Sequence, residues 1–126
     1  MSIQGKEFIK AAQASMSSDC EAGFRSAISR AYYAMYHETC GILTCCPPTS
    51  HDGVVQYLTT DARRKSEPYE LMSLVQLGAV LKQQKTKRKR ADYQLDEDIS
   101  SSEANASLSA VEKMLAKIDA MKLSVA

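Results

Sequence analysis

The chain has 126 residues, of which 44% are hydrophobic and 25% are charged, and its formal net charge is +1. These values are close to the average of globular proteins, so the chain can bury a hydrophobic core, and its length predicts a single domain over residues 1–126. No apolar run has the length of a membrane span and the N-terminus has no signal-peptide pattern, which favours a cytoplasmic protein without membrane contact.

The first half of the chain predicts two helices, because hydrophobic side chains recur at three- and four-residue steps. The first helix is expected over residues 3–16. The second begins at a capping box of Ser18 and Glu21 and ends before Pro47-Pro48. Its core face is expected to consist of Phe24, Ile28, Ala31, Met35 and Ile42.

The middle of the chain predicts a short helix followed by a long one. Thr49 and Asp52 form a second capping box, which opens the short helix. After a basic connector over residues 61–67, Pro68 suits the first position of the long helix, which is expected to end near Arg90. The side chains expected to point inward from the long helix are Leu71, Met72, Val75 and Leu81.

An acidic loop over residues 91–100 is expected next, and Ser100 and Glu103 form a third capping box before the last helix. The inward side chains of that helix are expected to be Ala104, Leu108, Val111, Leu115 and Ile118. No segment has the pattern of a strand. The sequence therefore predicts an all-α fold, an antiparallel up-and-down bundle of four main helices plus one short helix.

Polar and aromatic side chains mark the middle of the second helix. Arg30 and His37 are seven residues apart, about 700° on an α-helix, so they share one stripe with Tyr33 between them. The core face is centred about 120° away from Arg30, and Tyr32 and Tyr36 lie further round again. Because a helix with large side chains on several faces usually has a second partner, we expect a homodimer interface on this helix.

The cysteines and the charged residues bear on metal binding and on nucleic-acid binding. Cys20, Cys40, Cys45 and Cys46 have no zinc-site spacing, and we expect free, mostly buried thiols in a reducing compartment. The scattered acids give no metal-ligand set, so we expect no metal and no cofactor. Residues 61–90 contain nine basic and three acidic side chains, a block that either binds nucleic acid or is only solvated surface.

Three stretches, in order, resemble the HEPN superfamily, in particular its small stand-alone members. Residues 27–37 (AISRAYYAMYH) are similar to the family's second helix, residues 51–54 (HDGV) to the HxGV start of its short helix, and residues 88–93 (RKRADY) to the RxxADY element of its long helix. With the closing amphipathic helix, the resemblance covers nearly the whole chain.

The resemblance implies a dimeric bundle in which the R-x4–6-H motifs of two protomers meet in a cleft. It also implies metal-independent endoribonuclease activity of the kind found in toxin–antitoxin and phage-defence systems, with an antitoxin protein as a partner. Arg30 and His37, with six residues between them, fill the motif and are the candidate catalytic residues. The candidate site-lining or RNA-binding residues are Tyr33, His51, Arg88, Asp92 and Tyr93.

The chain departs from the family pattern at two positions. Ala31 follows the motif arginine where a polar residue is common, and Thr39 stands two residues after His37. In one subgroup a tyrosine at the latter position is modified by a nucleotidyltransferase antitoxin, and that mechanism has no target residue here.

RNA cleavage would use this pair in defined roles. The 2′-hydroxyl is the nucleophile, a base removes its proton, an acid protonates the leaving 5′-oxygen, and positive charge stabilises the transition state. His37 supplies the base or the acid and Arg30 holds the phosphate. Because one histidine cannot fill both proton-transfer roles at once, a second protomer would be part of the mechanism.

The same residues also have a purely structural interpretation. Arg30 and His37 would then only hydrogen-bond across a helix interface, His51 would cap or pack at a helix start, and Arg88, Asp92 and Tyr93 would form a structural cluster. A non-catalytic module that binds a nucleotidyltransferase-like partner protein or a small nucleotide is the alternative function.

Overall fold

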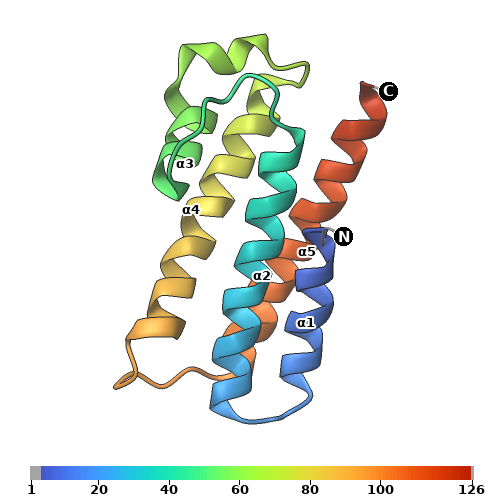
Figure 1. Ribbon diagram of the computed structural model, residues 1–126. Helices are drawn as coiled ribbons and strands as arrows, with labels where there is room; N and C mark the ends of the chain where they lie inside the picture. Colours follow the sequence, from blue (N-terminus) through green and yellow to red (C-terminus); the bar gives the residue numbers. More distant parts are fainter. Residues whose placement is uncertain (1–3, 126) are drawn as a thin grey trace.

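The 22-residue helix α2 (Glu21–Ile42) lies at the centre of the computed structural model, which describes residues 4–125 (Figure 1). It packs against α1 (Lys6–Met16), α4 (Leu71–Tyr93) and α5 (Ser101–Ser124). The four main helices run alternately up and down the bundle in chain order (Figure 1). Over the described residues there is no strand, and the predicted all-α bundle of four main helices plus one short helix is confirmed.

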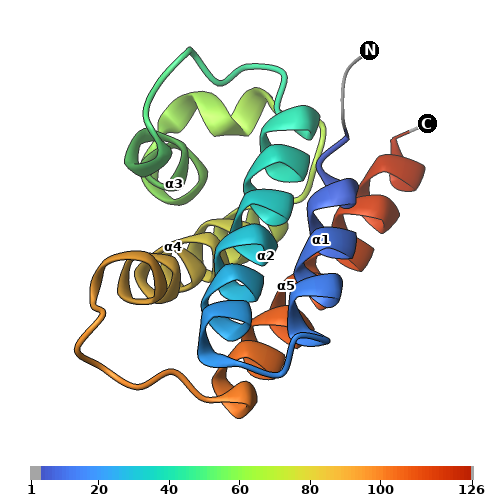
Figure 2. The ribbon, with the colours of Figure 1, turned by 60° about the horizontal axis from the view of Figure 1, so that its bottom comes forward.

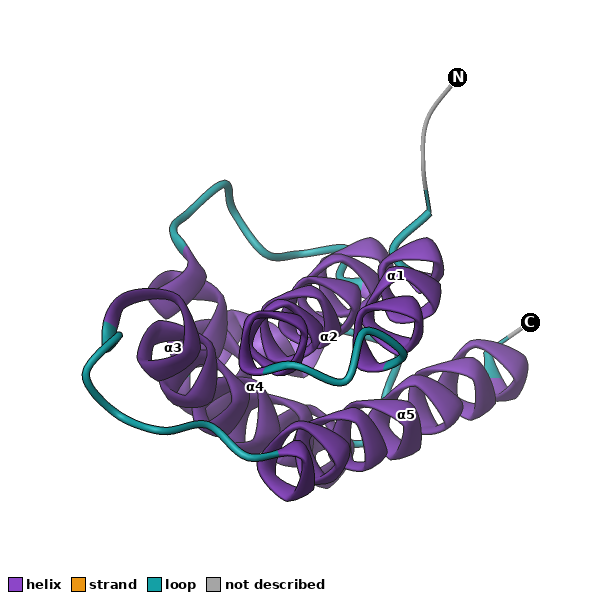
Figure 3. Ribbon diagram, turned by 90° about the horizontal axis from the view of Figure 1, so that it is seen from below, coloured by secondary structure: helices purple, strands orange, loops and turns teal. Residues whose placement is uncertain are grey.

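The short helix α3 (His51–Thr60) and a 3-10 helix, η1 (Ala62–Ser66), connect α2 to α4. Seen from below, α3 and α1 lie on opposite sides of α4 (Figure 3). Gly78 permits the close contact of α4 with α3, because a Cβ atom there would lie 2.7 Å from Thr59 Cγ2.

The predicted basic connector contains a helical turn of its own, η1. A hydrogen bond from the Arg63 amide to the Asp61 carboxylate at 2.8 Å holds the start of this turn.

The core is built from the helix faces that hydrophobic periodicity indicates, most accurately in α5. All five side chains expected to point inward from the last helix are buried, and so are Ile28, Ala31, Met35 and Ile42 of α2. Phe24 is only partly buried at the edge of the core. The long, uninterrupted amphipathic pattern of α5 fixes its orientation, because only one face is apolar.

The inward face of α4 differs from the predicted one. Leu71 and Met72 are 39% and 73% exposed, whereas the buried side chains of this helix include Leu74, Leu77 and Leu81. The helix begins at Leu71 rather than at Pro68, so these two residues lie in its first turn. The buried face of α4 therefore starts one turn later than predicted. Of the four side chains expected to point inward, only Leu81 is buried, and Val75 is half-buried.

Two of the three predicted capping boxes were wrong. Ser18 donates to the Ser15 carbonyl at 2.7 Å, and Cys20 instead precedes α2 without a side-chain cap. At α3 the cap is Ser50, whose hydroxyl accepts from the Gly53 amide at 3.1 Å, in place of Thr49. Ser100 does cap α5, accepting from the Glu103 amide at 3.2 Å.

Helix ends also shift from their expected positions. α2 ends at Ile42, before the proline pair, and α4 continues to Tyr93 because its C-terminus is capped by a tertiary contact described below. The first helix is described from Lys6, and the expected start at residue 3 lies outside the described residues. Among residues 4–125 no helix combines the length and hydrophobicity needed to cross a membrane.

Candidate functional site

An open groove of about 610 Å³ runs along the side of α2 that faces solvent between α1 and the end of α4. Figure 2 shows these helices, with α1 directly beside α2. We call it the α2 groove, and its walls are formed by Phe8, Ala22, Arg25, Ser26, Ser29, Arg30, Tyr33, His37, Ala91 and Asp92. Four of the seven residues singled out in the sequence, Arg30, Tyr33, His37 and Asp92, are therefore brought together.

Arg30 and His37 are both exposed in this groove. Over the described residues neither side chain has a hydrogen-bond or ion-pair partner. The His37 ring stacks on Phe8, with centroids 5.4 Å apart and planes at 20°, and on Tyr33 at 6.1 Å and 24°. Stacking restrains the imidazole plane while its ring nitrogens keep no protein partner, so both polar groups are free to bind a ligand.

Asp92 is the acidic member of the groove. Its Oδ2 atom accepts hydrogen bonds from Ser29 Oγ and from Arg88 Nη1, each at 3.2 Å. The Arg88 guanidinium lies 5.3 Å from the ring centroid of Tyr32 and 5.5 Å from that of Tyr33. With its side chain only 12% exposed, Arg88 lies behind the groove wall and orients Asp92 and Tyr33.

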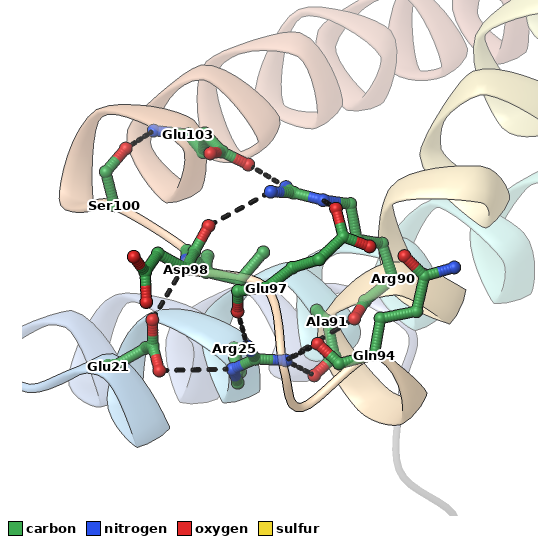
Figure 4. Close-up of polar contacts among 10 residues, drawn as sticks. Glu21, Arg25, Arg90, Ala91, Gln94, Glu97, Asp98, Ser100 and Glu103 are labelled. Carbon is green, nitrogen blue, oxygen red and sulfur yellow. Dashed lines mark hydrogen bonds and ion pairs between the residues drawn. The ribbon is translucent and has the colours of Figure 1, made fainter.

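A buried arginine holds the end of α4 against α2 (Figure 4). Arg25 is 8% exposed and donates through Nη1 to the carbonyls of Ala91 at 2.9 Å, Gln94 at 3.2 Å and Arg90 at 3.4 Å. Its Nη2 donates to the Glu97 carbonyl. The Ala91 carbonyl lies in the last turn of α4, where carbonyls lack intrahelical partners, and a cation there also complements the helix dipole. Arg25 thereby fixes the turn that carries Asp92.

The acidic loop after α4 is tied down by further contacts in the same place (Figure 4). The Glu21 carboxylate accepts from the Ile99 amide at 2.7 Å. Arg90 pairs with Glu97 at 3.1 Å and with Glu103. The basic and acidic segments that are adjacent in sequence are therefore partly neutralised against each other.

His51 lies behind the groove and is not among its lining residues. Its Nδ1 is 2.5 Å from the Tyr32 hydroxyl, and its ring stacks on Tyr36 with centroids 3.8 Å apart and planes at 6°. Burial lowers the pKa of His51, and the nearby cations Lys85 and Arg88 lower it further. The imidazole is packed at the start of α3 against Tyr32, Tyr33 and Tyr36, and these tyrosines separate it from the groove.

The placement of Tyr32 on the outer side of α2 was wrong. Tyr32 is fully buried, and burial raises the pKa of its hydroxyl. Because α2 is covered by α1, α4 and α5, its buried arc is wider than the apolar stripe alone indicates. Tyr33 and Tyr36 are half-buried. A dimer interface on α2 would therefore include two of these three tyrosines rather than all three.

The remaining sequence-predicted candidates lie elsewhere. Tyr93 is 72% exposed and does not line the groove. In the basic block, Lys85 pairs with Asp52 at 2.5 Å and Arg63 pairs with Asp61 at 2.7 Å. Lys82 and Lys89 are exposed.

No group of three or more His, Cys, Asp or Glu side chains within the described part of the chain could hold a metal ion. All four cysteines are free thiols, as expected, but Cys20 and Cys45 are exposed, so the expectation that most are buried was wrong.

Sequence reasoning missed three residues that shape the site, namely Phe8, Arg25 and Ser29. Arg25 and Ser29 precede Tyr33 by eight and four residues on α2, so they lie near Tyr33 round the helix, on the side away from Arg30. Phe8 was expected on the apolar face of the first helix, and nothing local indicates that its ring stacks on His37.

No family model, no curated protein and no solved structure matches this chain. The fold and the groove define a small helical protein whose site must be interpreted from its own geometry.

Proposed function

We propose that the protein is a metal-independent endoribonuclease of the HEPN type that cleaves RNA in the α2 groove. The observation that carries the proposal is the exposure of Arg30 and His37, about two helical turns apart, in one groove, both without protein partners among the described residues. An unpaired guanidinium in an open groove suits a phosphate, because its planar donors match phosphate oxygens.

The chemistry requires little more than this pair. His37 removes the proton of the 2′-hydroxyl, which attacks phosphorus, and Arg30 stabilises the charge that develops on the phosphoryl oxygens. The P–O5′ bond breaks and its oxygen takes a proton from a second acid. The products are a 2′,3′-cyclic phosphate and a 5′-hydroxyl, so water and metal are not required for the first step.

The second acid is supplied by another protomer in this proposal. The α2 groove contains one imidazole, since His51 is packed behind the tyrosines and does not line it. The exposed stripe of α2 includes Ala22, Arg30, His37 and Gly41, and no other helix of residues 4–125 covers it. A homodimer formed through this stripe would bring two grooves face to face, with the partner's His37 as the acid.

The test is cleavage of a 5′-labelled single-stranded RNA in the presence of EDTA. We expect the wild-type dimer to release fragments with cyclic phosphate ends, and we expect Arg30→Ala and His37→Ala to reduce the rate at least a hundredfold, about 2.7 kcal/mol of transition-state stabilisation. Lys113→Ala is the matched control, since Lys113 is exposed on α5 and lies outside the groove. Equal rates for the wild type and both groove variants would refute the assignment.

In the cell, such an activity would make the protein a toxin of a toxin–antitoxin or phage-defence system that an antitoxin partner holds inactive. We expect expression of the protein alone to arrest growth and His37→Ala to relieve the arrest. Harmless expression of a folded dimer that cleaves RNA in vitro would contradict the toxin role but not the nuclease.

A second candidate function is a non-catalytic module that binds a nucleotide or a partner protein. The stacking of His37 on Phe8 and on Tyr33 favours it, because this packing gives the histidine a structural role without catalysis. Thermal stabilisation by nucleotides together with intact RNA after prolonged incubation would support this function over the nuclease.

A further inference from the structure

Asp92 lines the α2 groove, and one of its two carboxylate oxygens is held in place while the other has no partner among the described residues. Ser29 and Arg88 both donate to Oδ2, whereas Oδ1 has no hydrogen-bond partner within the described residues. A carboxylate oxygen accepts about two hydrogen bonds, so Oδ2 is saturated and Oδ1 is the remaining acceptor. The side chain is 28% exposed and lines the groove.

The position of this acceptor is determined by several contacts rather than by one flexible side chain. Arg88 is itself packed over the rings of Tyr32 and Tyr33, and Arg25 caps the helix end from which Asp92 projects. Side chains whose rotamers are locked by packing and hydrogen bonds give recognition sites their precision. Asp96, in the loop three residues beyond the end of α4, is exposed and has no such contact.

The other walls of the groove restrict the ligand that can reach Asp92. Arg30 supplies positive charge, and Phe8, Tyr33 and His37 supply aromatic surface. A negatively charged Asp92 repels phosphate, so a nucleotide would bind with its phosphate toward Arg30 and its base toward Asp92. Aromatic side chains next to polar groups are the usual means by which proteins hold unpaired RNA bases.

Carboxylates distinguish bases by their amino groups. An aspartate accepts a hydrogen bond from the exocyclic amine of cytosine, and the amines of adenine and guanine are equivalent donors. Uracil has no amino group, and carbonyl oxygens flank its single ring N–H, so a carboxylate facing it is repelled on both sides.

We propose that Asp92 recognises the exocyclic amino group of a base bound in the α2 groove, so that the protein selects RNA with adenine, cytosine or guanine at that position over uracil. The inference rests on the proposed function in taking RNA as the ligand of the groove. It adds a specificity determinant that does not take part in the cleavage chemistry.

The test measures binding of hexamers that cannot be cleaved because every 2′-hydroxyl is methylated. Fluorescence anisotropy would compare 2′-O-methyl hexamers of adenine, cytosine, uracil, and purine, the adenine analogue without an amino group. We expect the adenine and cytosine hexamers to bind about tenfold more tightly than the uracil and purine hexamers, the effect of one charge-assisted hydrogen bond. Because the 2′-hydroxyl is blocked, a preference cannot arise from Asp92 binding the sugar.

Protein variants provide an independent check. Asp92→Ala should bind all four hexamers with equal affinity, whereas Asp96→Ala, which removes an equal charge from the nearby loop, should keep the wild-type preference. If Asp92→Ala does not fold, the comparison of adenine with purine on the wild-type protein still decides the matter.

Equal wild-type affinity for the adenine and purine hexamers overturns the inference, as does an unchanged preference in Asp92→Ala. Absence of binding to every hexamer overturns it too. Cleavage of RNA by the same preparation then shows whether the proposed function survives without base recognition, since the two assays have separate readouts.

Discussion

Replacing Arg25 by methionine should destabilise the bundle and loosen the candidate site at the same time. Methionine preserves most of the apolar stem but removes the guanidinium from the C-terminus of α4. The carbonyl of Ala91 is the most buried acceptor, and its 2.9 Å bond is shielded from water. The carbonyls of Gln94 and Glu97 are partly accessible and can be hydrated after the substitution.

The magnitude follows from these contacts. The buried, charge-assisted bond contributes about 2 kcal/mol, and the cation at the helix end about 1 kcal/mol. The two partly hydrated carbonyls add a few tenths of a kcal/mol each. We therefore expect Arg25→Met to lower the free energy of unfolding by about 3–4 kcal/mol and the Tm by roughly 10 °C or more for a domain of this size.

Urea denaturation followed by circular dichroism gives the free energy, and amide hydrogen exchange locates the change. The last turn of α4, from Ala91 to Gln94, should lose protection before the middle of the helix does. Arg63→Met is the control, because Arg63 is a largely exposed arginine on η1 that, within the described part of the chain, forms an ion pair with Asp61 alone. It should leave the urea midpoint close to that of the wild type. A loss below about 1 kcal/mol for Arg25→Met, with unchanged exchange at the end of α4, would show that Arg25 does not cap this helix.

Three further predictions concern the rest of the bundle. A Cβ at Gly78 would meet α3 at 2.7 Å whereas one at Gly41 meets nothing within 4 Å, so Gly78→Ala should cost about 1–3 kcal/mol and Gly41→Ala should raise stability by up to about 1 kcal/mol; equal effects in urea denaturation would contradict the packing argument. Burial alone would raise the pKa of Glu67, but donors that include the Tyr57 hydroxyl and two backbone amides hold it below its ordinary 4.5. Its stabilisation is therefore complete above about pH 4.5 and is lost as the pH falls through the lower folded value, and Glu67→Gln should lower stability by about 2 kcal/mol at pH 7 and flatten the acid limb of the stability profile. Burial and then Lys85 lower the pKa of His51, so the stability that the neutral ring provides is complete above about pH 6.5 and is lost as the pH falls through the folded value; Lys85→Ala should raise the pKa of His51 in an NMR titration, and an unchanged value would rule out this coupling.

The sequence was informative where an element depends on its own periodicity. All five side chains expected to point inward from α5 are buried, because the helix has one apolar face and a Ser100 cap that forms as expected; Ser107, Met114 and Met121, which were not predicted, are buried as well. The prediction of buried residues failed where several helices pack against one helix. Tyr32 is buried because three helices pack around α2, and the local sequence of α2 does not show how many helices will pack against it.

The candidate site divides in the same way. The shared stripe of Arg30, Tyr33 and His37 is a property of the helical repeat, so the sequence determines it before any tertiary contact forms. Asp92 is more than fifty residues away, and only the packing of α4 on α2, held by Arg25, brings it to the stripe. The sequence by itself thus determined the helices and the polar stripe, which depend on short-range geometry. The tertiary structure alone decided that the stripe becomes a groove with an oriented carboxylate, because that outcome depends on contacts between residues far apart in the chain.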